Sequence, residues 1–373
     1  MINYQIDILP IGDKKCGEAI AIRFGELELA ANDPQKQTVV LIDGGYQGDA
    51  EMIVEHVGNH FNAKKIDLVV STHDHDDHTG GLIGVVGTIP IDQLWMHQPW
   101  EHSVDMLASR REKFVSARLT DKLQKSLQAL NDLQLAADAA GIVPVEPFSG
   151  RQFVSPYGIL TVLGPSQAYY EELLQQILTD SEAKAQGQPV GLATELSNLI
   201  RKAAQAAAGV FESHRIETLT DNGETSPSNN TSAILLLELA DKSERFLFCG
   251  DAGIPALERA YLEYTTLGYK TGDLNFVQVP HHGSRRNVGP TILDKFLGTR
   301  TVQPDMQRGA ACVSVAKDCT DDGHPKKVVT NAFKRRGYPV TPTKGKGVMY
   351  GFSRVGWSSV NPLPLFESVE SDE

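Results

Sequence analysis

The stretch STHDHDDHTGG, residues 71–81, places three histidines and three aspartates at six consecutive positions. The apolar run IDLVV comes directly before it and predicts a strand that ends at the polar cluster. Alternate side chains of an extended segment point the same way, so His73 and His75 can bind one cation while Asp77 and His78 face a second. Imidazole nitrogens with a carboxylate oxygen suit Zn²⁺, with Mn²⁺ or iron as substitutes. We therefore interpret this stretch as the floor of a metal site and not as a solvated turn.

Two later stretches repeat the order of apolar strand followed by polar side chain. RFLFCGDAG (245–253) places Asp251 after a strand, where a carboxylate that bridges two metals can lie. NFVQVPHHGS (275–284) places His281 and His282 after another strand. Adjacent histidines point to different sides, so we expect one of the two to bind metal.

Composition and charge limit the class of protein. With 373 residues and 41% hydrophobic composition, the chain can bury the core of one large domain or two modest ones. No stretch approaches the roughly 20 apolar residues of a membrane-spanning helix, and the N-terminus lacks the pattern of a signal peptide. We expect a soluble, cytoplasmic protein without membrane contact. Four scattered cysteines lack paired metal-ligand spacing, so disulfides are not expected.

The net charge of −12 opposes non-specific binding to nucleic acid, which depends on an excess of Lys and Arg. A local basic groove is still compatible with that charge. Two short clusters can line one: Arg285-Arg286 and Lys334-Arg335-Arg336.

The order of elements predicts an α/β fold. Short strands occur in two groups with helices between them, which is typical of two sheets packed face to face and covered by helices, a four-layer αββα sandwich. Gly80 and Gly81 are expected to let the chain turn after the histidine cluster. We divide the chain into a first half of the fold, a polar helical insertion, a second half and an acidic tail that is expected to be disordered at its end: residues 1–165, 166–226, 227–355 and 356–373.

Three motifs in this order, STHDHDDHTGGL, FLFCGDAG and VPHHGS, resemble the metallo-β-lactamase fold superfamily. Two weaker matches agree: CGEAIAIRF has Glu18 where the family has aspartate, and VVLIDGG contains Asp43. PHHGS, together with GHP at 323–325, is similar to the soluble catalytic domain of ComEC-type DNA-uptake proteins and their stand-alone relatives. The resemblance covers roughly residues 1–165 and 227–350.

The resemblance implies a hydrolase with two divalent metal ions, Zn²⁺ or Mn²⁺. Carried over position by position, the first ion would be held by His73 and His75, the second by Asp77, His78 and His281, and Asp251 would bridge them. Asp77 and Asp251 would also orient the attacking water, while His282 or His324 would stabilise or protonate the leaving group.

The chain departs from many members of the superfamily at one ligand position. These members have a third histidine of the first metal site just before the strand that leads to the Gly-Asp turn. Here the segment reads SPSNNTSAILLLE, with Asn229 and Asn230. The first metal then binds weakly, prefers Mn²⁺ or takes a ligand from the substrate.

The resemblance favours a metal-dependent phosphodiesterase or nuclease whose substrate is a nucleic acid or a nucleotide. The acidic net charge favours a small or single-stranded substrate over a long duplex. One alternative is a hydrolase of a carbonyl compound such as a lactam, lactone or thioester. Another is a metal-bound scaffold in which the 166–226 insertion docks a partner protein or a second copy of the chain. His97 either contacts substrate or packs in the core.

Overall fold

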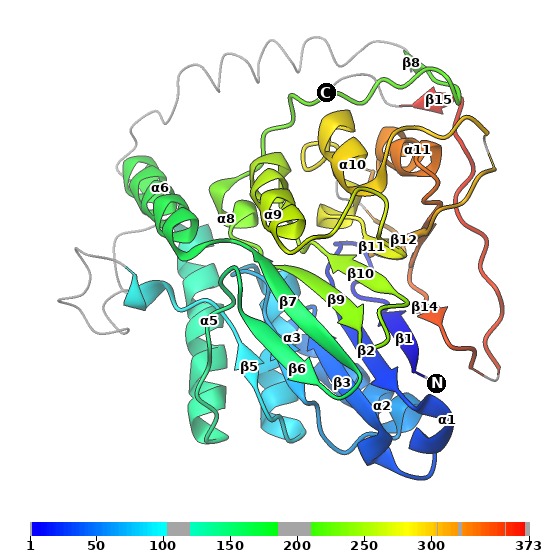
Figure 1. Cartoon of the computed structure of the whole chain (residues 1–373). Coiled ribbons are helices and arrows are strands. Elements are labelled where there is room, and N and C mark those ends of the chain that lie inside the picture. The colour runs from blue at the N-terminus through cyan, green and yellow to red at the C-terminus, as the bar shows by residue number, and fades with distance from the viewer. Residues whose placement is uncertain are drawn as a thin grey trace.

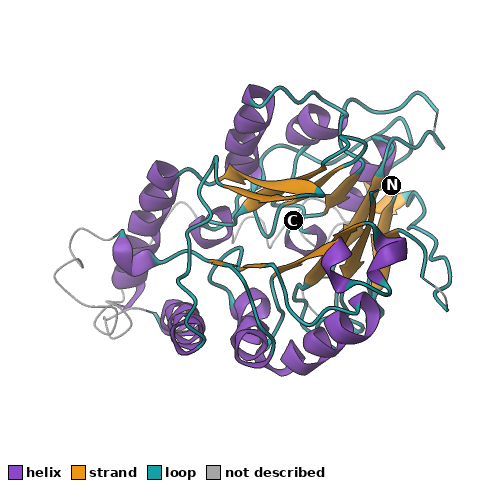
Figure 2. Cartoon of the chain, turned by 60° about the horizontal axis from the view of Figure 1, so that its bottom comes forward, coloured by secondary structure: helices purple, strands orange, loops and turns teal. Residues whose placement is uncertain are grey.

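The computed structural model describes residues 2–102, 120–185, 210–303, 305–319, 323–354 and 356–369. Within these residues two large mixed sheets face each other, and helices cover the outer face of each (Figure 2). The predicted four-layer αββα sandwich is thereby confirmed. None of the described helices combines the length and the apolar character needed to cross a bilayer.

The first sheet has six strands in the spatial order β14 (Val348–Gly351), β1 (Asn3–Ile8), β2 (Ile20–Gly25), β3 (Gln37–Ile42), β4 (Leu68–Val70) and β5 (Leu94–Trp95). The second has seven, in the order β13 (Val340–Pro342), β12 (Ala310–Val313), β11 (Phe276–Gln278), β10 (Arg245–Phe248), β9 (Ile234–Leu239), β7 (Gly158–Gly164) and β6 (Gln152–Ser155). A small separate sheet pairs β8 (Val210–Phe211) with β15 (Ser368–Val369), as Figure 1 shows.

Successive side chains of a strand point to opposite faces of its sheet, and this alternation gives three layers of apolar core. In β2, Ile20 and Ile22 join the cluster between the two sheets, whereas Ala21 joins the cluster between the first sheet and its helices. In β9, Leu235 lies between the sheets, whereas Leu236 faces the helices of the second sheet. Both faces of these strands are buried, which is why they are apolar almost throughout.

The helices form the two outer layers. The first sheet is covered by α2 (Ala50–Phe61), α3 (Asp76–Thr88) and α5 (Asp121–Ala139), and the second by α9 (Ile254–Thr266), α10 (Pro290–Leu297) and α11 (Lys327–Arg335). The short helices α1 (Leu27–Ala30) and α8 (Pro227–Asn230) lie in connections.

The first helix of the predicted insertion is part of the packed core. Helix α6 (Gln167–Ala185) places Tyr170 and Leu174 in the core under the first sheet, and Tyr169 and Leu173 in the core under the second. Residues 186–209 of the insertion lie outside the described residues, so its expected role as a partner surface stays a prediction.

The C-terminal segment packs as far as the structure describes it. Val369 is buried in the core of the second sheet's helices, and the Phe366 amide donates a hydrogen bond to Asn331. The last residues of the acidic tail, 370–373, lie outside the described residues.

Candidate metal centre

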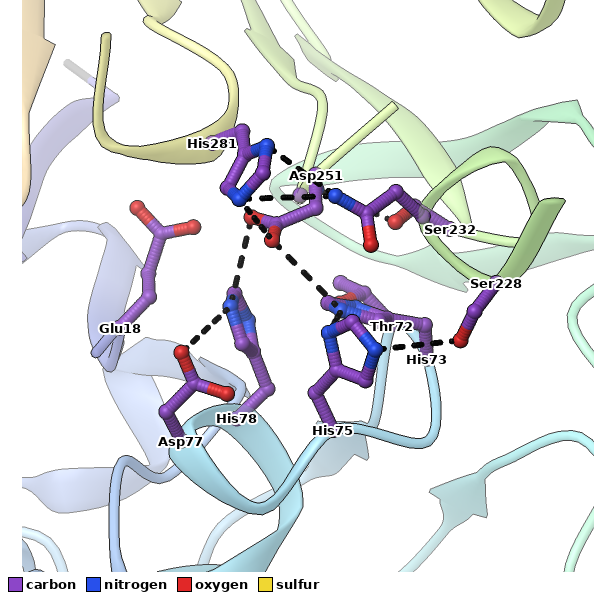
Figure 3. A network of polar contacts seen from close by, with 12 residues as sticks. Glu18, Thr72, His73, His75, Asp77, His78, Ser228, Ser232, Asp251 and His281 are labelled. Atoms are coloured by element: carbon purple, nitrogen blue, oxygen red, sulfur yellow. Dashed lines mark hydrogen bonds and ion pairs between the residues drawn. The ribbon is translucent and has the colours of Figure 1, made fainter. Parts of the chain in front are cut away.

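Parallel strands bring the polar side chains to one edge of the molecule. Strands β3 and β4 run parallel in the first sheet, and β10 and β11 run parallel in the second. Carboxyl ends of parallel strands lie at the same edge of a sheet. Asp43 and His73 follow β3 and β4, whereas Asp251 and His281 follow β10 and β11, and Figure 3 shows the labelled members of this group converging.

The histidine cluster is partly helical, which corrects the prediction of an extended loop. His75 has extended dihedrals, φ −79° and ψ 143°, and α3 begins at the next residue. Asp77 and His78 therefore lie in the first turn of a helix and not on alternate sides of a strand. The change of direction occurs at the N-terminus of α3, where the helix dipole favours carboxylates.

The glycines after the cluster serve close packing and not a turn, contrary to the sequence prediction. Gly80 and Gly81 lie inside α3, against the loop that follows β3. A Cβ atom on Gly81 would lie 2.0 Å from the carbonyl oxygen of Gly44, and one on Gly80 would lie 2.9 Å from the amide nitrogen of Gln47. Only glycine lets this helix approach so closely.

One group of donor atoms consists of His73, His75 and Asp251, which lie within 4.8 Å of one another. His73 Nε2 is 3.0 Å from His75 Nδ1 and 3.7 Å from Asp251 Oδ2. Ser228, from α8, places its hydroxyl 3.2 Å from His75 Nε2 and donates a hydrogen bond to Asp74. Sequence reasoning did not single out Ser228, because its proximity to His75 depends on a contact across 153 residues.

A second group consists of Asp77, His78 and His282. Asp77 Oδ2 lies 4.0 Å from His78 Nε2 and 3.7 Å from His282 Nε2. Asp251 connects the two groups, because its Oδ1 atom lies 3.3 Å from His78 Nε2.

The structure places His282, and not His281, beside Asp77 and His78. The resemblance assigned His281 to this second group. Its Nε2 atom instead lies 3.5 Å from Asp251 Oδ2, the same oxygen that faces His73. His281 and His282 both have left-handed dihedrals, φ 49° and 55°, a conformation that non-glycine residues rarely adopt and that often marks a functional site.

Buried acceptors orient the histidines of the second group. Asp43 accepts hydrogen bonds from His78 Nδ1 and from the Thr72 hydroxyl, both at 2.7 Å. His282 Nδ1 donates to the carbonyl oxygen of Ser314 at 2.9 Å. With each Nδ1 atom engaged, the Nε2 atoms face the group, as is typical of metal-ligating histidines. Asp43, noted in the sequence only as part of VVLIDGG, thus contacts one of the candidate ligands directly.

The pKa values of two donor carboxylates, Asp251 and Asp77, lie below their usual range, which favours their anionic form. Burial would raise the pKa of Asp251, but the charges of His281 and His78 hold it well below its usual range. Burial opposes ionisation of Asp77 too, and its bond with His282 brings the pKa of that carboxyl below its usual range. Glu18 differs, because burial raises its pKa to about 8.

The residue set fits bound cations. His78 Nε2 and Asp251 Oδ1 are buried and have no hydrogen-bond partner among the described residues, although they face each other. Buried polar atoms are nearly always satisfied. A divalent cation between nitrogen and carboxylate donors would satisfy both.

The region that lacks the third histidine is occupied by amides. Asn230 Oδ1 accepts a hydrogen bond from the Gly253 amide, so it holds the turn after Asp251. Asn229 Nδ2 lies 3.0 Å from His281 Nδ1, and Asn287 Oδ1 lies 2.9 Å from the same nitrogen. These amides position His281 and the Asp251 turn.

A cleft of about 580 Å³ is lined by members of both donor groups, namely His75, Asp77, Asp251 and His282. His324 lines this cleft and stacks on His281 with ring centroids 6.2 Å apart. His97 lies elsewhere: it is buried, stacks on Tyr170 at 4.3 Å, and burial lowers its pKa to about 3. The geometry of His97 is that of a packed side chain.

The two predicted basic clusters differ in their positions. Arg286 lines the cleft. In the second cluster the two arginines are buried, where Arg335 pairs with Glu212 at 2.8 Å and Arg336 with Glu217 at 2.6 Å. Those pairs attach the 210–217 segment to α11, and they cannot line a groove.

Residues 34–162 match the family model described as the metallo-beta-lactamase superfamily. The two mixed sheets flanked by helices are consistent with the αββα fold of this superfamily. The match covers residues 34–162 alone, and together with the two donor groups it makes the chain similar to the metal-dependent hydrolases of that superfamily, with the class of substrate left open. A comparison with the curated proteins finds no match.

Several solved structures resemble the chain at low identity. A mutant of the CmlA beta-hydroxylase is 12% identical over 93% of this chain and 54% of its own, with a TM-score of 0.41. The Rm3 metallo-beta-lactamase is 11% identical over 73% and 76%, and a long form RNase Z from yeast is 10% identical over 74% and 32%, both with a TM-score of 0.32. The chain thus spans about half the length of the hydroxylase.

Proposed function

We propose that the chain is a metal-dependent phosphodiesterase that acts on a nucleic acid or a nucleotide. The observation that carries this proposal is the positive charge of side chains that line the same cleft as the donor groups. Four cationic side chains line it: Lys15, Lys122, Lys125 and Arg286. They surround the donor groups of a protein whose net charge is −12.

These four cations are available to a ligand. Within the described residues none of them forms an ion pair. Lysines elsewhere on the surface behave differently, since Lys65 pairs with Asp67 and Lys295 pairs with Glu258. Four acidic side chains also line the cleft. Asp77 and Asp251 belong to the donor groups, which leaves Asp76 and Glu224 against the four cations. Clustered charge in a cleft concentrates a ligand of opposite sign.

The donor groups would hold two divalent ions. His73, His75 and Asp251 would hold one, Asp77, His78 and His282 the other, with Asp251 shared between them. Such ions supply an activated water and neutralise charge on phosphoryl oxygens. Placing His282 among the donors leaves His324, which lines the same cleft, as the side chain that would protonate the leaving group.

The resemblance to ComEC-type catalytic domains supports the same class of substrate. The four cations of the cleft suit a phosphodiester better than a neutral lactam or lactone, because those carbonyl compounds carry no charge to match them. Three of the four are lysines, which contact phosphates as point charges, and phosphate contacts carry no sequence information directly. We therefore expect phosphate recognition without strong sequence preference.

The experiment is a panel of substrates offered to purified protein loaded with Zn²⁺ or Mn²⁺. The panel contains bis(4-nitrophenyl) phosphate, single-stranded DNA and RNA, duplex DNA, cyclic nucleotides, a chromogenic lactam and a thioester. We expect hydrolysis of phosphodiesters, lost in Asp77→Asn and kept in Glu51→Gln, an exposed carboxyl on α2. Cleavage of the lactam or thioester with every phosphodiester left intact would overturn the proposal.

A further inference from the structure

Two cysteines far apart in the sequence lie in direct contact at the edge of the cleft. The Sγ atoms of Cys16 and Cys319 are 2.9 Å apart, across 303 residues of chain. Both side chains are in the reduced, thiol form. A disulfide has an S–S distance of about 2.05 Å, so the two sulfur atoms need to approach by only roughly 0.9 Å.

The two segments that carry these thiols already run side by side. The Ala316 amide donates a hydrogen bond to Cys16 Sγ at 3.3 Å, and the Ser314 hydroxyl donates to the carbonyl oxygen of Gly17 at 2.6 Å. The Asp318 amide donates to the carbonyl oxygen of Asp13 at 2.8 Å. These bonds hold the cysteines face to face, so little conformational entropy is lost on cross-linking them.

Each segment also supports one member of the second donor group. The Glu18 amide, two residues after Cys16, donates a hydrogen bond to the carbonyl oxygen of Asp77 at 3.0 Å. On the other side, the Ser314 carbonyl accepts the hydrogen bond of His282 Nδ1. A covalent link between the segments would therefore join the supports of Asp77 and His282.

We propose that Cys16 and Cys319 are a thiol–disulfide modification site, oxidised by a low-molecular-weight disulfide such as glutathione disulfide. The Cys319 thiol loses its proton and attacks one sulfur of that disulfide, which forms a mixed disulfide and releases one glutathione thiol. Cys16 then loses its proton and attacks the Cys319 sulfur, which forms the protein disulfide and releases the second glutathione. The two protons and two electrons leave with the two glutathione thiols.

Accessibility sets this order of attack. Cys319 is half-buried and Cys16 is 2% exposed, so the small disulfide meets Cys319 first and Cys16 resolves the adduct. The other two cysteines cannot compete. Cys249 and Cys312 are each 2% exposed and lie in the apolar cores of the second sheet. This site does not depend on which substrate the enzyme hydrolyses.

The test uses the full-length protein, incubated with glutathione disulfide, then alkylated, digested and analysed by mass spectrometry. We expect a cross-linked peptide pair that contains Cys16 and Cys319. Thiol titration of the unfolded protein should fall from four groups to two and return to four after dithiothreitol. Cys319→Ser should abolish the cross-link, while Cys249→Ser should keep it.

Three outcomes would overturn the proposal: four thiols that persist after oxidation, glutathione bound to Cys319 without a cross-link, or a cross-link that involves Cys249 or Cys312. The peptide map of the unsubstituted protein decides among these outcomes even if a serine variant fails to fold.

Discussion

Asp251 Oδ1 lies 3.3 Å from His78 Nε2, and neither atom has a hydrogen-bond partner among the described residues. The two side chains follow strands of different sheets. Asp251 follows β10 of the second sheet, and His78 lies at the start of α3, the helix after β4 of the first sheet. A carboxylate and an imidazole that face each other in this way, both oriented by their surroundings, supply two of the donor atoms that a bound cation needs.

Replacing Asp251 by asparagine should remove metal from both donor groups. The amide keeps the size of the side chain but loses the negative charge that both groups share. We expect the metal content of purified protein, measured by elemental analysis, to fall from about two ions per chain to less than one. Asp241→Asn, in the exposed turn between β9 and β10, serves as the control and should keep the full content. Equal metal content in both variants would contradict the bridging position.

Replacing Asp43 by asparagine should weaken metal binding without removing a ligand. An amide can present its NH₂ group to His78 Nδ1, which favours the tautomer that carries its proton on Nε2, the atom that would bind metal. Losses of such orienting partners cost about 10- to 100-fold in metal affinity. Competition with a chelator measures this affinity directly. An unchanged dissociation constant would show that His78 is oriented without Asp43.

Reversing the charge of Lys122 or Lys125 should weaken binding of an anionic substrate. Each substitution by glutamate should raise KM about fivefold with little change in kcat, the effect of about 1 kcal/mol of lost attraction. Lys64→Glu is the matched control, because Lys64 is exposed at the opposite end of β4 from the cleft. The difference between the cleft variants and this control should shrink at high salt. Equal KM values for all three variants would remove these lysines from substrate binding.

Two glycines of α3 should respond in opposite ways to alanine. In Gly81→Ala the new Cβ meets the Gly44 carbonyl at 2.0 Å, so the helix must move away from the loop after β3. We expect a loss of about 3 kcal/mol in the free energy of unfolding together with impaired metal binding. In Gly87→Ala nothing lies within 4 Å of the new atom, so alanine should stabilise the helix by about 0.5–1 kcal/mol. Urea unfolding of both variants tests the pair, and equal destabilisation would contradict the packing argument.

His102 should make the stability depend on pH. Its hydrogen bond with Glu146, at 2.7 Å, and its contact with Glu171 raise the pKa of His102 above the ordinary value of 6.5. Because the folded pKa is raised, the contribution of His102 is complete below about pH 6.5 and is lost as pH rises through the folded value. The difference in unfolding free energy between the unsubstituted protein and His102→Gln should be about 1 kcal/mol at about pH 5.5 and near zero at about pH 9. A difference that does not change with pH would contradict the expected contribution of His102 to the pH dependence of stability.

Much of the architecture could be predicted because local sequence pattern decides it. The strand expected in IDLVV is β4, Leu68–Val70, and the strand expected in RFLFCGDAG is β10, Arg245–Phe248. Both are short apolar runs that end at polar or glycine residues. Strand β13, Val340–Pro342, was missed, since its three residues, one of them a proline, carry no apolar period.

The amino-acid sequence by itself determined that carboxylates and histidines follow buried strands, because strand propensity and residue type are local properties. Only the tertiary structure decided which of two adjacent histidines joins Asp77, because the left-handed dihedrals of both His281 and His282 break the simple alternation of side chains. Tertiary contacts likewise placed Cys16 beside Cys319 and buried Arg335 against Glu212. The sequence identifies the charged and reactive residues, but the distances between them, on which a site depends, are set by the packing of the two sheets.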